Sequence, residues 1–161
     1  MKQLNIKAEK TLGGNTYYIR PFGAMKAAGI SADVVSFILP VLGAAAPLIG
    51  GSLKDSEVDL MNIDTEAAGK TLANALPDGS GDRVEGLLKK LLTKHNNVSV
   101  TREGEEEAVN LNEDLANELF CGEVQDMFVL AVEVIKANYT GFFKNLGSRF
   151  GGVIEKLMAK V

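Results

Sequence analysis

The stretch DRVEGLLKKLLTKHNNVSVT, residues 82–101, carries the clearest structural pattern in the chain. Counted from Val84, its apolar residues recur at i, i+3, i+4, i+7 and i+8, which places them on one face of a helix. Asn96-Asn97 ends this helix, and Val98 and Val100 then alternate with polar residues as they do in a strand. The stretch therefore predicts an amphipathic helix that leads directly into a strand.

A β-hairpin is predicted on the C-terminal side of this stretch. The charged turn at residues 102–107 contains Gly104, and Ala108, Val109 and Leu111 form a weaker return strand. The sequence thus predicts that the chain turns after residues 98–101 and that the return strand pairs with them as a hairpin.

A second hairpin is predicted at the start of the chain. Apolar residues alternate with polar ones over residues 4–8, and a strand-like run at residues 16–19 follows the Gly13-Gly14 turn. Pro21 stops the second strand because it has no N–H to donate. The two hairpins are compatible with one small antiparallel sheet.

Helices account for most of the remaining chain. They are predicted over residues 22–30, from Val34 onward with Ser31 or Asp33 as N-cap, near residues 65–76, after Asn112, over residues 123–138, and in an amphipathic tail at 144–161. We expect four to five of these helical segments to pack against the two hairpins, which gives an α+β fold class, mostly helical, as one domain over residues 1–161.

The most apolar part of the chain is the segment 34–51. It is apolar all round rather than along one stripe, so part of it should be buried on every side. The uncharged run from Val34 to Leu53 reaches the ~20 residues that a membrane span needs. Pro40 and Pro47 interrupt it, so a transmembrane helix is the weaker interpretation.

Composition narrows the classes of function. The 21 acidic and 17 basic residues give a net charge of −4, which argues against binding to a nucleic-acid backbone. One cysteine and one histidine rule out an intrachain disulfide and a Cys/His zinc site. No secretory signal is recognised in residues 1–10, so the expected compartment is the cytoplasm.

No group of residues indicates catalysis, a metal or a cofactor. His95 follows the helix of residues 82–94 and is expected to be structural. Cys121 has acidic neighbours in the sequence and is expected to be a buried, inert thiol at a helix junction. The carboxylates of the turn at 103–107 are expected to form a solvated face. We expect no activity that depends on His95 or Cys121.

A resemblance to a known family rests on the order of these pieces and on three short motifs. The motifs are YYIRPF at residues 17–22, LFCGE at residues 119–123 and VIKANYTGFF at residues 134–143. Over most of its length the chain resembles the tail assembly chaperones of long-tailed bacteriophages, particularly those of phages and prophages of Gram-positive bacteria. The last motif is the most specific.

The resemblance implies a non-enzymatic protein of the host cytoplasm that is not part of the mature virion. Its expected partners are the tape measure protein, which it keeps soluble, and the tail tube protein, whose assembly it promotes. Self-association is expected from the apolar excess, and membrane binding is not. The sequence leaves two alternatives open, namely a small membrane-active phage protein that uses residues 34–53 and a small ligand-binding domain.

Partner-binding residues are predicted from unexplained apolar surface. A chaperone of a long helical protein must cover apolar stripes, and aliphatic side chains do so without directional demands. The candidates are Phe37, Leu39, Leu42, Leu48, Ile49, Phe142 and Phe143.

Overall fold

The computed structural model describes two long stretches of the chain and two single residues. The described residues are 6, 8–45, 66 and 81–140, with the backbone alone for 37–45. The predicted helix near 65–76, apart from Glu66, and the predicted tail at 144–161 lie outside them.

The two predicted hairpins form one antiparallel sheet in the order β1-β2-β3-β4. Its strands are β1 (Ala8–Leu12), β2 (Asn15–Ile19), β3 (Val98–Thr101) and β4 (Val109–Asn110). The hairpins join through β2 and β3, where Tyr17 is opposite Val100 and Ile19 is opposite Val98. The predicted α+β fold class is confirmed: among the described residues, helices outweigh the four-stranded sheet.

The first strand begins later than its sequence pattern suggests. Gly13 and Gly14 have φ values of 56° and 81°, which suit a two-residue hairpin turn, and the ladder runs back from there to the pair Ala8–Ile19. It ends there because β2 stops just before Arg20-Pro21, as the proline predicted.

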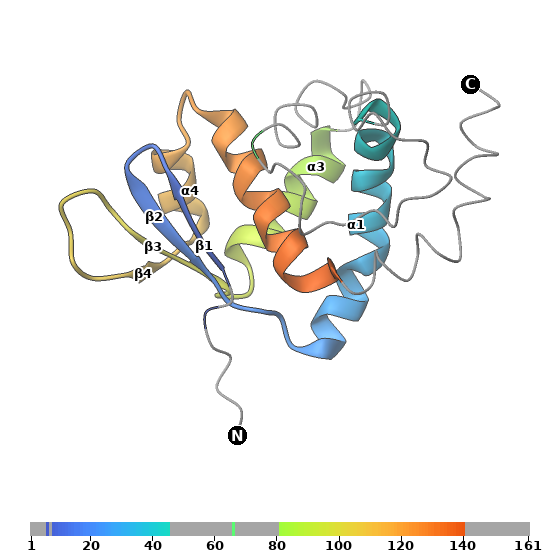
Figure 1. Cartoon of the computed structure of the whole chain (residues 1–161), viewed down its shortest axis with the longest axis horizontal. Coiled ribbons are helices and arrows are strands. Elements are labelled where there is room, and N and C mark those ends of the chain that lie inside the picture. Colours follow the sequence, from blue (N-terminus) through green and yellow to red (C-terminus); the bar gives the residue numbers. More distant parts are fainter. Residues whose placement is uncertain (1–5, 7, 46–65, 67–80, 141–161) are drawn as a thin grey trace.

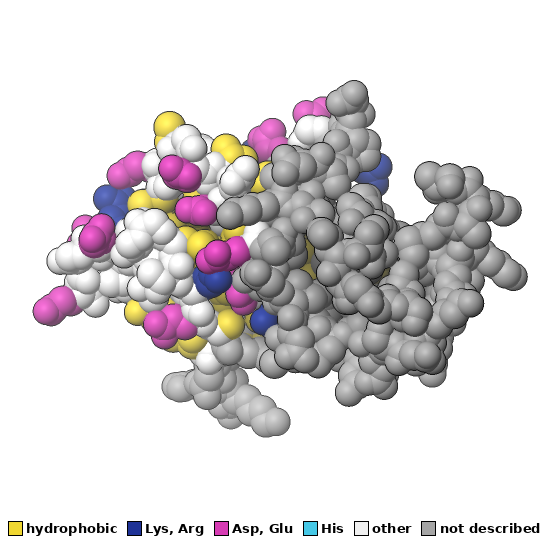
Figure 2. All heavy atoms as spheres, turned by 45° about the horizontal axis from the view of Figure 1, so that its top comes forward, with side chains coloured by type: hydrophobic (Ala, Val, Ile, Leu, Met, Phe, Trp, Pro, Cys, Tyr) yellow, Lys and Arg dark blue, Asp and Glu magenta, His cyan; other side chains and the backbone are white. Residues whose placement is uncertain are grey.

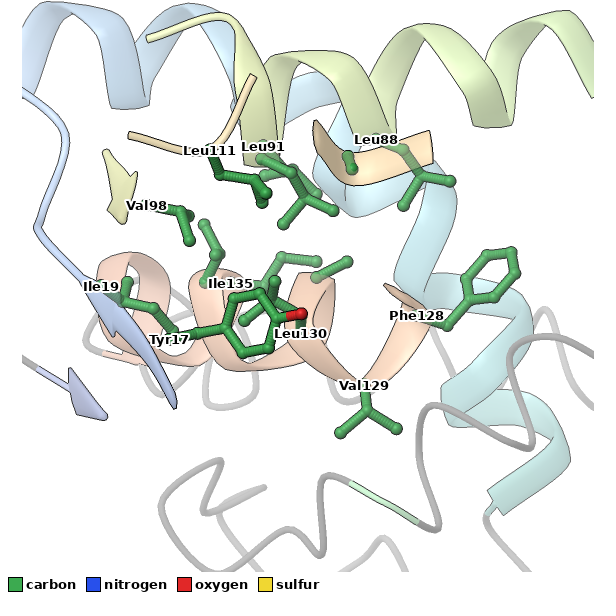
Figure 3. Close-up of a cluster of buried hydrophobic side chains, with 14 of the residues drawn as sticks. Tyr17, Ile19, Leu88, Leu91, Val98, Leu111, Phe128, Val129, Leu130 and Ile135 are labelled. Carbon is green, nitrogen blue, oxygen red and sulfur yellow. The ribbon is translucent and has the colours of Figure 1, made fainter. Parts of the chain in front are cut away.

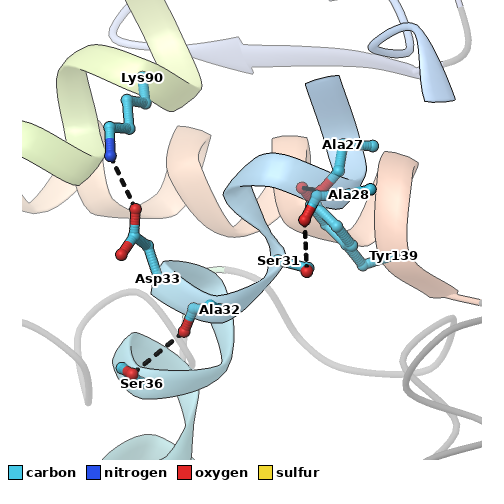
Figure 4. A network of polar contacts seen from close by, with 8 residues as sticks. All are labelled: Ala27, Ala28, Ser31, Ala32, Asp33, Ser36, Lys90 and Tyr139. Atoms are coloured by element: carbon cyan, nitrogen blue, oxygen red, sulfur yellow. Dashed lines mark hydrogen bonds and ion pairs between the residues drawn. The ribbon is translucent and has the colours of Figure 1, made fainter. Parts of the chain in front are cut away.

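The helix α1 (Ala24–Ala45) replaces two predicted segments. Ser31 does not cap a second helix: its hydroxyl donates to the carbonyl oxygen of Ala28 at 2.7 Å, one turn back within the same helix. Asp33 is not a cap either, and forms an ion pair with Lys90 (Figure 4). The predicted interruption at Pro40 is also wrong, since the helical backbone continues past it.

The quoted stretch folds as its periodicity predicts. Helix α3 (Gly81–Leu88) continues into the π-helical turn η2 (Lys89–Thr93), and Leu87, Leu88, Leu91 and Leu92 are all buried. Asn96 ends the helix in a left-handed conformation, φ 52°. The buried Asn97 amide donates to the Leu91 carbonyl oxygen at 2.7 Å, which fixes the path from helix to strand.

Two further helices follow the sheet. Asn112 caps α4 (Glu113–Leu119), as predicted, by accepting the Leu115 N–H at 2.8 Å. A turn through Gly122 (φ 79°) then leads into a helix over residues 124–140. Figure 1 shows this helix between the sheet and α1, so one element contributes to both halves of the molecule.

The core forms where the sheet meets α1, α3, η2, α4 and the 124–140 helix (Figure 3). The Tyr17 ring stacks on Phe120 with ring centroids 5.6 Å apart. Leu91, Leu130 and Ile135 are almost fully buried around them. Burial raises the pKa of Tyr17 to about 12, although a hydrogen bond from Asn15 opposes this shift.

Candidate partner-binding site

Three of the seven predicted contact residues lie on the second half of α1. The helical backbone carries Phe37, Leu39 and Leu42, whose side chains lie outside the description. The remaining four lie outside the described residues: Leu48, Ile49, Phe142 and Phe143. The segment therefore starts as part of a regular helix that is docked at its N-terminal half.

The first half of α1 has one buried and one exposed face. Ile30 and Val34 are buried in the core. The first residue of the apolar segment that begins at Val34 is therefore a core residue. Ala28, Ala32 and other small residues face solvent on the opposite side, and Met25 is 89% exposed. The exposed side of α1 thus carries Met25 and small residues, with Lys26 and Asp33 also exposed, and its apolar part suits contact with another apolar surface.

Sequence patterns alone did not find Met25 as a surface residue. The predicted helix at 22–30 grouped it with Phe22 and Ala28 on one face. In the structure Phe22 precedes the helix and is buried, whereas Met25 and Ala28 are exposed. The later start of α1 changes which residues share a face.

The most specific motif of the sequence resemblance holds α1 in place. In residues 134–143, Val134 and Ile135 are core residues. The Asn138 amide oxygen accepts the N–H of Phe22 at 2.7 Å, and the Tyr139 hydroxyl donates to the Ala27 carbonyl oxygen at 2.7 Å. This part of the motif is therefore structural, and it positions the helix that carries the candidate contact residues.

Removal of the Tyr139 hydroxyl should loosen this junction. Burial raises the pKa of Tyr139 to about 12, so the hydroxyl stays protonated and able to donate at neutral pH. Tyr139→Phe should lower the free energy of unfolding by about 1 kcal/mol, since one hydrogen bond at a partly buried carbonyl is lost. Urea unfolding measures this free energy, with Tyr18→Phe on β2 as the control. Equal losses in the two variants would contradict a stabilising role for the hydrogen bond from Tyr139 to Ala27.

His95 lies beside Phe22 and the start of α1. Its ring meets the Phe22 ring edge to face, with centroids 6.0 Å apart. Partial burial lowers the pKa of His95, and the charges of Lys26, Lys94 and Lys90 lower it further. The ring is therefore neutral at pH 7 and packs against an aromatic residue, as the structural interpretation predicts.

Cys121 is exposed, so the prediction of a buried thiol is wrong. It does lie at a helix junction, in the turn between α4 and the 124–140 helix. The neighbouring Phe120 fills the core position at this turn, and its stacking on Tyr17 leaves Cys121 to face solvent.

The pKa of His95 gives a pH dependence that can be measured. A folded-state pKa below the unfolded value of about 6.5 means that unfolding takes up a proton in mildly acidic solution. The stabilisation is complete above about pH 6.5 and is lost as the pH falls through the folded pKa. Melting temperatures of the wild type should fall between about pH 7 and 5.5, and His95→Gln should flatten this decrease. An identical decrease in both proteins would contradict the assignment.

Acidic side chains gather at the sheet end of the molecule. Residues 102–126 hold nine of the 21 acidic residues and one of the 17 basic residues, Arg102. Arg102 pairs with Glu118, and the carboxylates of the turn at 103–107 are exposed, as predicted. Figure 2 shows acidic side chains spread over the described part of one face, with exposed apolar side chains between them.

The described residues form neither a candidate metal site nor a membrane-spanning helix. These residues contain no group of three His, Cys, Asp or Glu side chains that could hold a metal ion. None of the helices formed by these residues is long and apolar enough to cross a membrane.

Two described surfaces are of a kind used in protein–protein contact. One is the exposed side of α1 around Met25, and the other is the acidic end of the sheet at residues 102–126. A comparison with protein-family models matches residues 13–151 to the phage tail assembly chaperone protein (TAC) family. The match covers most of the chain, which therefore belongs to the phage tail assembly chaperone family. No curated protein and no solved structure gives a significant match.

Proposed function

We propose that this chain is a non-enzymatic chaperone that binds the tape measure protein, keeps it soluble and promotes assembly of the tail tube around it. The observation that carries this proposal is the family match over residues 13–151. Tape measure proteins are long and helical, so their apolar stripes must be covered until the tube subunits enclose them.

The proposed contact surface is the exposed side of α1 together with the apolar residues that follow along the chain. The N-terminal half of α1 is fixed by Asn138, Tyr139 and Lys90, so the helix presents its free side without rearrangement. Met25 offers exposed apolar area, and the small residues Ala28, Gly29 and Ala32 leave room for an apolar helix to approach closely. The candidates from Phe37 to Ile49, with Phe142 and Phe143, extend this surface in the proposal.

The remaining parts of the proposal concern assembly. The chain associates with itself and acts in the host cytoplasm. It contacts the tail tube protein during assembly and leaves before the virion is complete. The acidic end at residues 102–126 is a second contact surface during assembly, because its charge disfavours apolar association and favours basic partners.

Complementation in an infected or induced host tests the proposed function. Deletion of the gene should abolish tails, and the wild-type chain supplied from a plasmid should restore them. Plasmid-borne His95→Gln and Cys121→Ser should restore tails equally well, since the proposed function gives neither residue a chemical role. Mass spectrometry should find the chain in lysates together with the tape measure protein and not in purified virions. Tails formed without the gene, or the chain in stoichiometric amounts in virions, would overturn the proposal.

A further inference from the structure

Helix α1 and the turn η2 lie side by side and run in opposite directions. Lys90 of η2 forms an ion pair with Asp33 of α1 at 2.7 Å (Figure 4). The ring of His95, which follows η2, meets the ring of Phe22, which precedes α1. Later residues of η2 therefore lie beside earlier residues of α1, and η2 forms one flank of the exposed side of that helix.

Three lysines gather where His95 meets the start of α1. Lys94 directly precedes His95, Lys90 lies about one turn earlier, and Lys26 lies in the first turn of α1. The charges of all three lysines lower the pKa of His95, which agrees with this placement. Lys26, Lys90 and Lys94 therefore form one basic flank to which two elements contribute.

Two of these lysines are not neutralised within the described part of the chain. Lys90 is paired with Asp33. Lys26 and Lys94 are exposed, and neither forms an ion pair with a residue that the structure describes. The first turn of α1 contains no acidic residue, so the positive end of its helix dipole adds to the charge of the lysines. The basic flank therefore attracts carboxylates, although the whole chain has a net charge of −4.

Apolar surface lies directly beside the basic flank. Met25 precedes Lys26 and is 89% exposed. Ala28, Gly29 and Ala32 are exposed further along the same helix, and such small side chains let another helix approach closely. The exposed side of α1 thus combines an apolar centre with two uncompensated positive charges at its N-terminal end.

We propose that the client segment that docks on α1 is an amphipathic helix whose apolar stripe is flanked by carboxylates. The stripe covers Met25, and the carboxylates meet Lys26 and Lys94. Charged groups at the rim of an apolar contact determine the choice and orientation of the partner more than its affinity. This inference rests on the proposed function, in which the client is the tape measure protein, and it specifies the chemistry of the client segment.

The acidic end of the molecule strengthens this selection. Residues 102–126 hold nine acidic residues and one basic residue, so this end repels a helix that carries carboxylates. The two ends therefore attract segments of opposite charge. An acidic amphipathic segment is directed to α1 and away from the sheet end.

Binding of two synthetic peptides to the full chain tests the charge preference. Both are helical peptides of equal length with the same stripe of leucine and alanine, and their flanking positions are glutamate in one peptide and glutamine in the other. The glutamate peptide should bind roughly tenfold more tightly at low salt, because each exposed ion pair contributes modestly and two lysines take part. Fluorescence anisotropy measures both dissociation constants. Equal affinities, or tighter binding of the glutamine peptide, would overturn the proposal.

A double variant, Lys26→Gln with Lys94→Gln, tests whether the preference resides on the basic flank. Both side chains are exposed, so the fold should tolerate the changes. The two peptides should then bind within about twofold of each other. Asn117→Asp with Gln125→Glu is the matched control, because it lowers the net charge equally at exposed positions of the acidic end. This control should keep the preference. A preference that survives the lysine changes, or that falls equally in the control, would overturn the proposal.

Co-purification with the tape measure protein separates this inference from the proposed function. Capture by the lysine double variant should be weaker than capture by the wild type, and high salt should reduce the difference because it screens exposed charges. Equal capture by both proteins at low salt would contradict the carboxylate contact and leave the chaperone function intact. Absence of capture by the wild type would instead contradict the proposed function itself.

Discussion

Leu91→Ala should lower the free energy of unfolding by about 2–5 kcal/mol. Leu91 is 0% exposed, in the turn η2 that connects helix α3 to the sheet. Its carbonyl oxygen also accepts the amide of the buried Asn97. Truncation leaves a cavity at the place where helix and strand are held together, so relaxation should recover little of the loss.

Met25→Ala is the matched control for this prediction. Met25 also projects from a helix but is 89% exposed, so its truncation should change stability by no more than about 0.5 kcal/mol. Urea unfolding of both variants gives the comparison. Equal losses of stability would show that the buried cluster around Leu91 is not the core of the fold.

Leu39→Ala combined with Leu48→Ala should weaken capture of the tape measure protein at least roughly tenfold, with little change in melting temperature. Both residues belong to the apolar segment that we propose as the contact surface, and each contributes through apolar area removed from water. Pull-down with a tagged chain, co-expressed with the tape measure protein, measures the first quantity. Calorimetry measures the second.

Val124→Ala provides the control for this double variant, because Val124 is an exposed apolar residue (52%) on another helix. It should change neither capture nor melting. If Leu39→Ala and Leu48→Ala both melt the protein, and hydrogen exchange protects the segment without client, then the segment is core and the assignment of the contact surface is wrong.

The sequence predicted those elements of the fold that have a local physical cause. The 3.6-residue period of Val84 to Leu92 gave α3 and η2, Asn112 gave the cap of α4, and Pro21 gave the end of β2. Each of these signals acts within a few residues of the chain. Tertiary contacts seldom override such signals when they agree with one another.

The wrong predictions concern positions where tertiary contacts determine the local structure. Ser31 has the residue type of an N-cap, yet α1 runs through it, and Asn138 and Tyr139 hold the chain before it at Phe22 and Ala27. Cys121 is exposed, whereas the neighbouring Phe120 is buried and stacks on the Tyr17 ring. Neither contact can be read from the neighbouring residues.

The candidate site could be predicted only in outline. An excess of apolar residues from Val34 onward indicated a surface for contact, but Val34 itself belongs to the core. The exposed face at Met25 depends on the start of α1 at Ala24, which the packing of Phe22 sets. Spacing along a helix shows which residues share a face, and only the packed structure shows which face is free.

Co-expression with the tape measure protein tests the central claim most directly. The tape measure protein is expressed alone, with this chain, and with the Leu39→Ala, Leu48→Ala double variant, and its soluble fraction is measured after centrifugation and size-exclusion chromatography. The proposed function predicts aggregation of the tape measure protein alone, a soluble complex with the wild-type chain and a clear loss of that complex with the variant. A tape measure protein that is equally soluble without the chain, or that elutes separately from it, would contradict the proposed function.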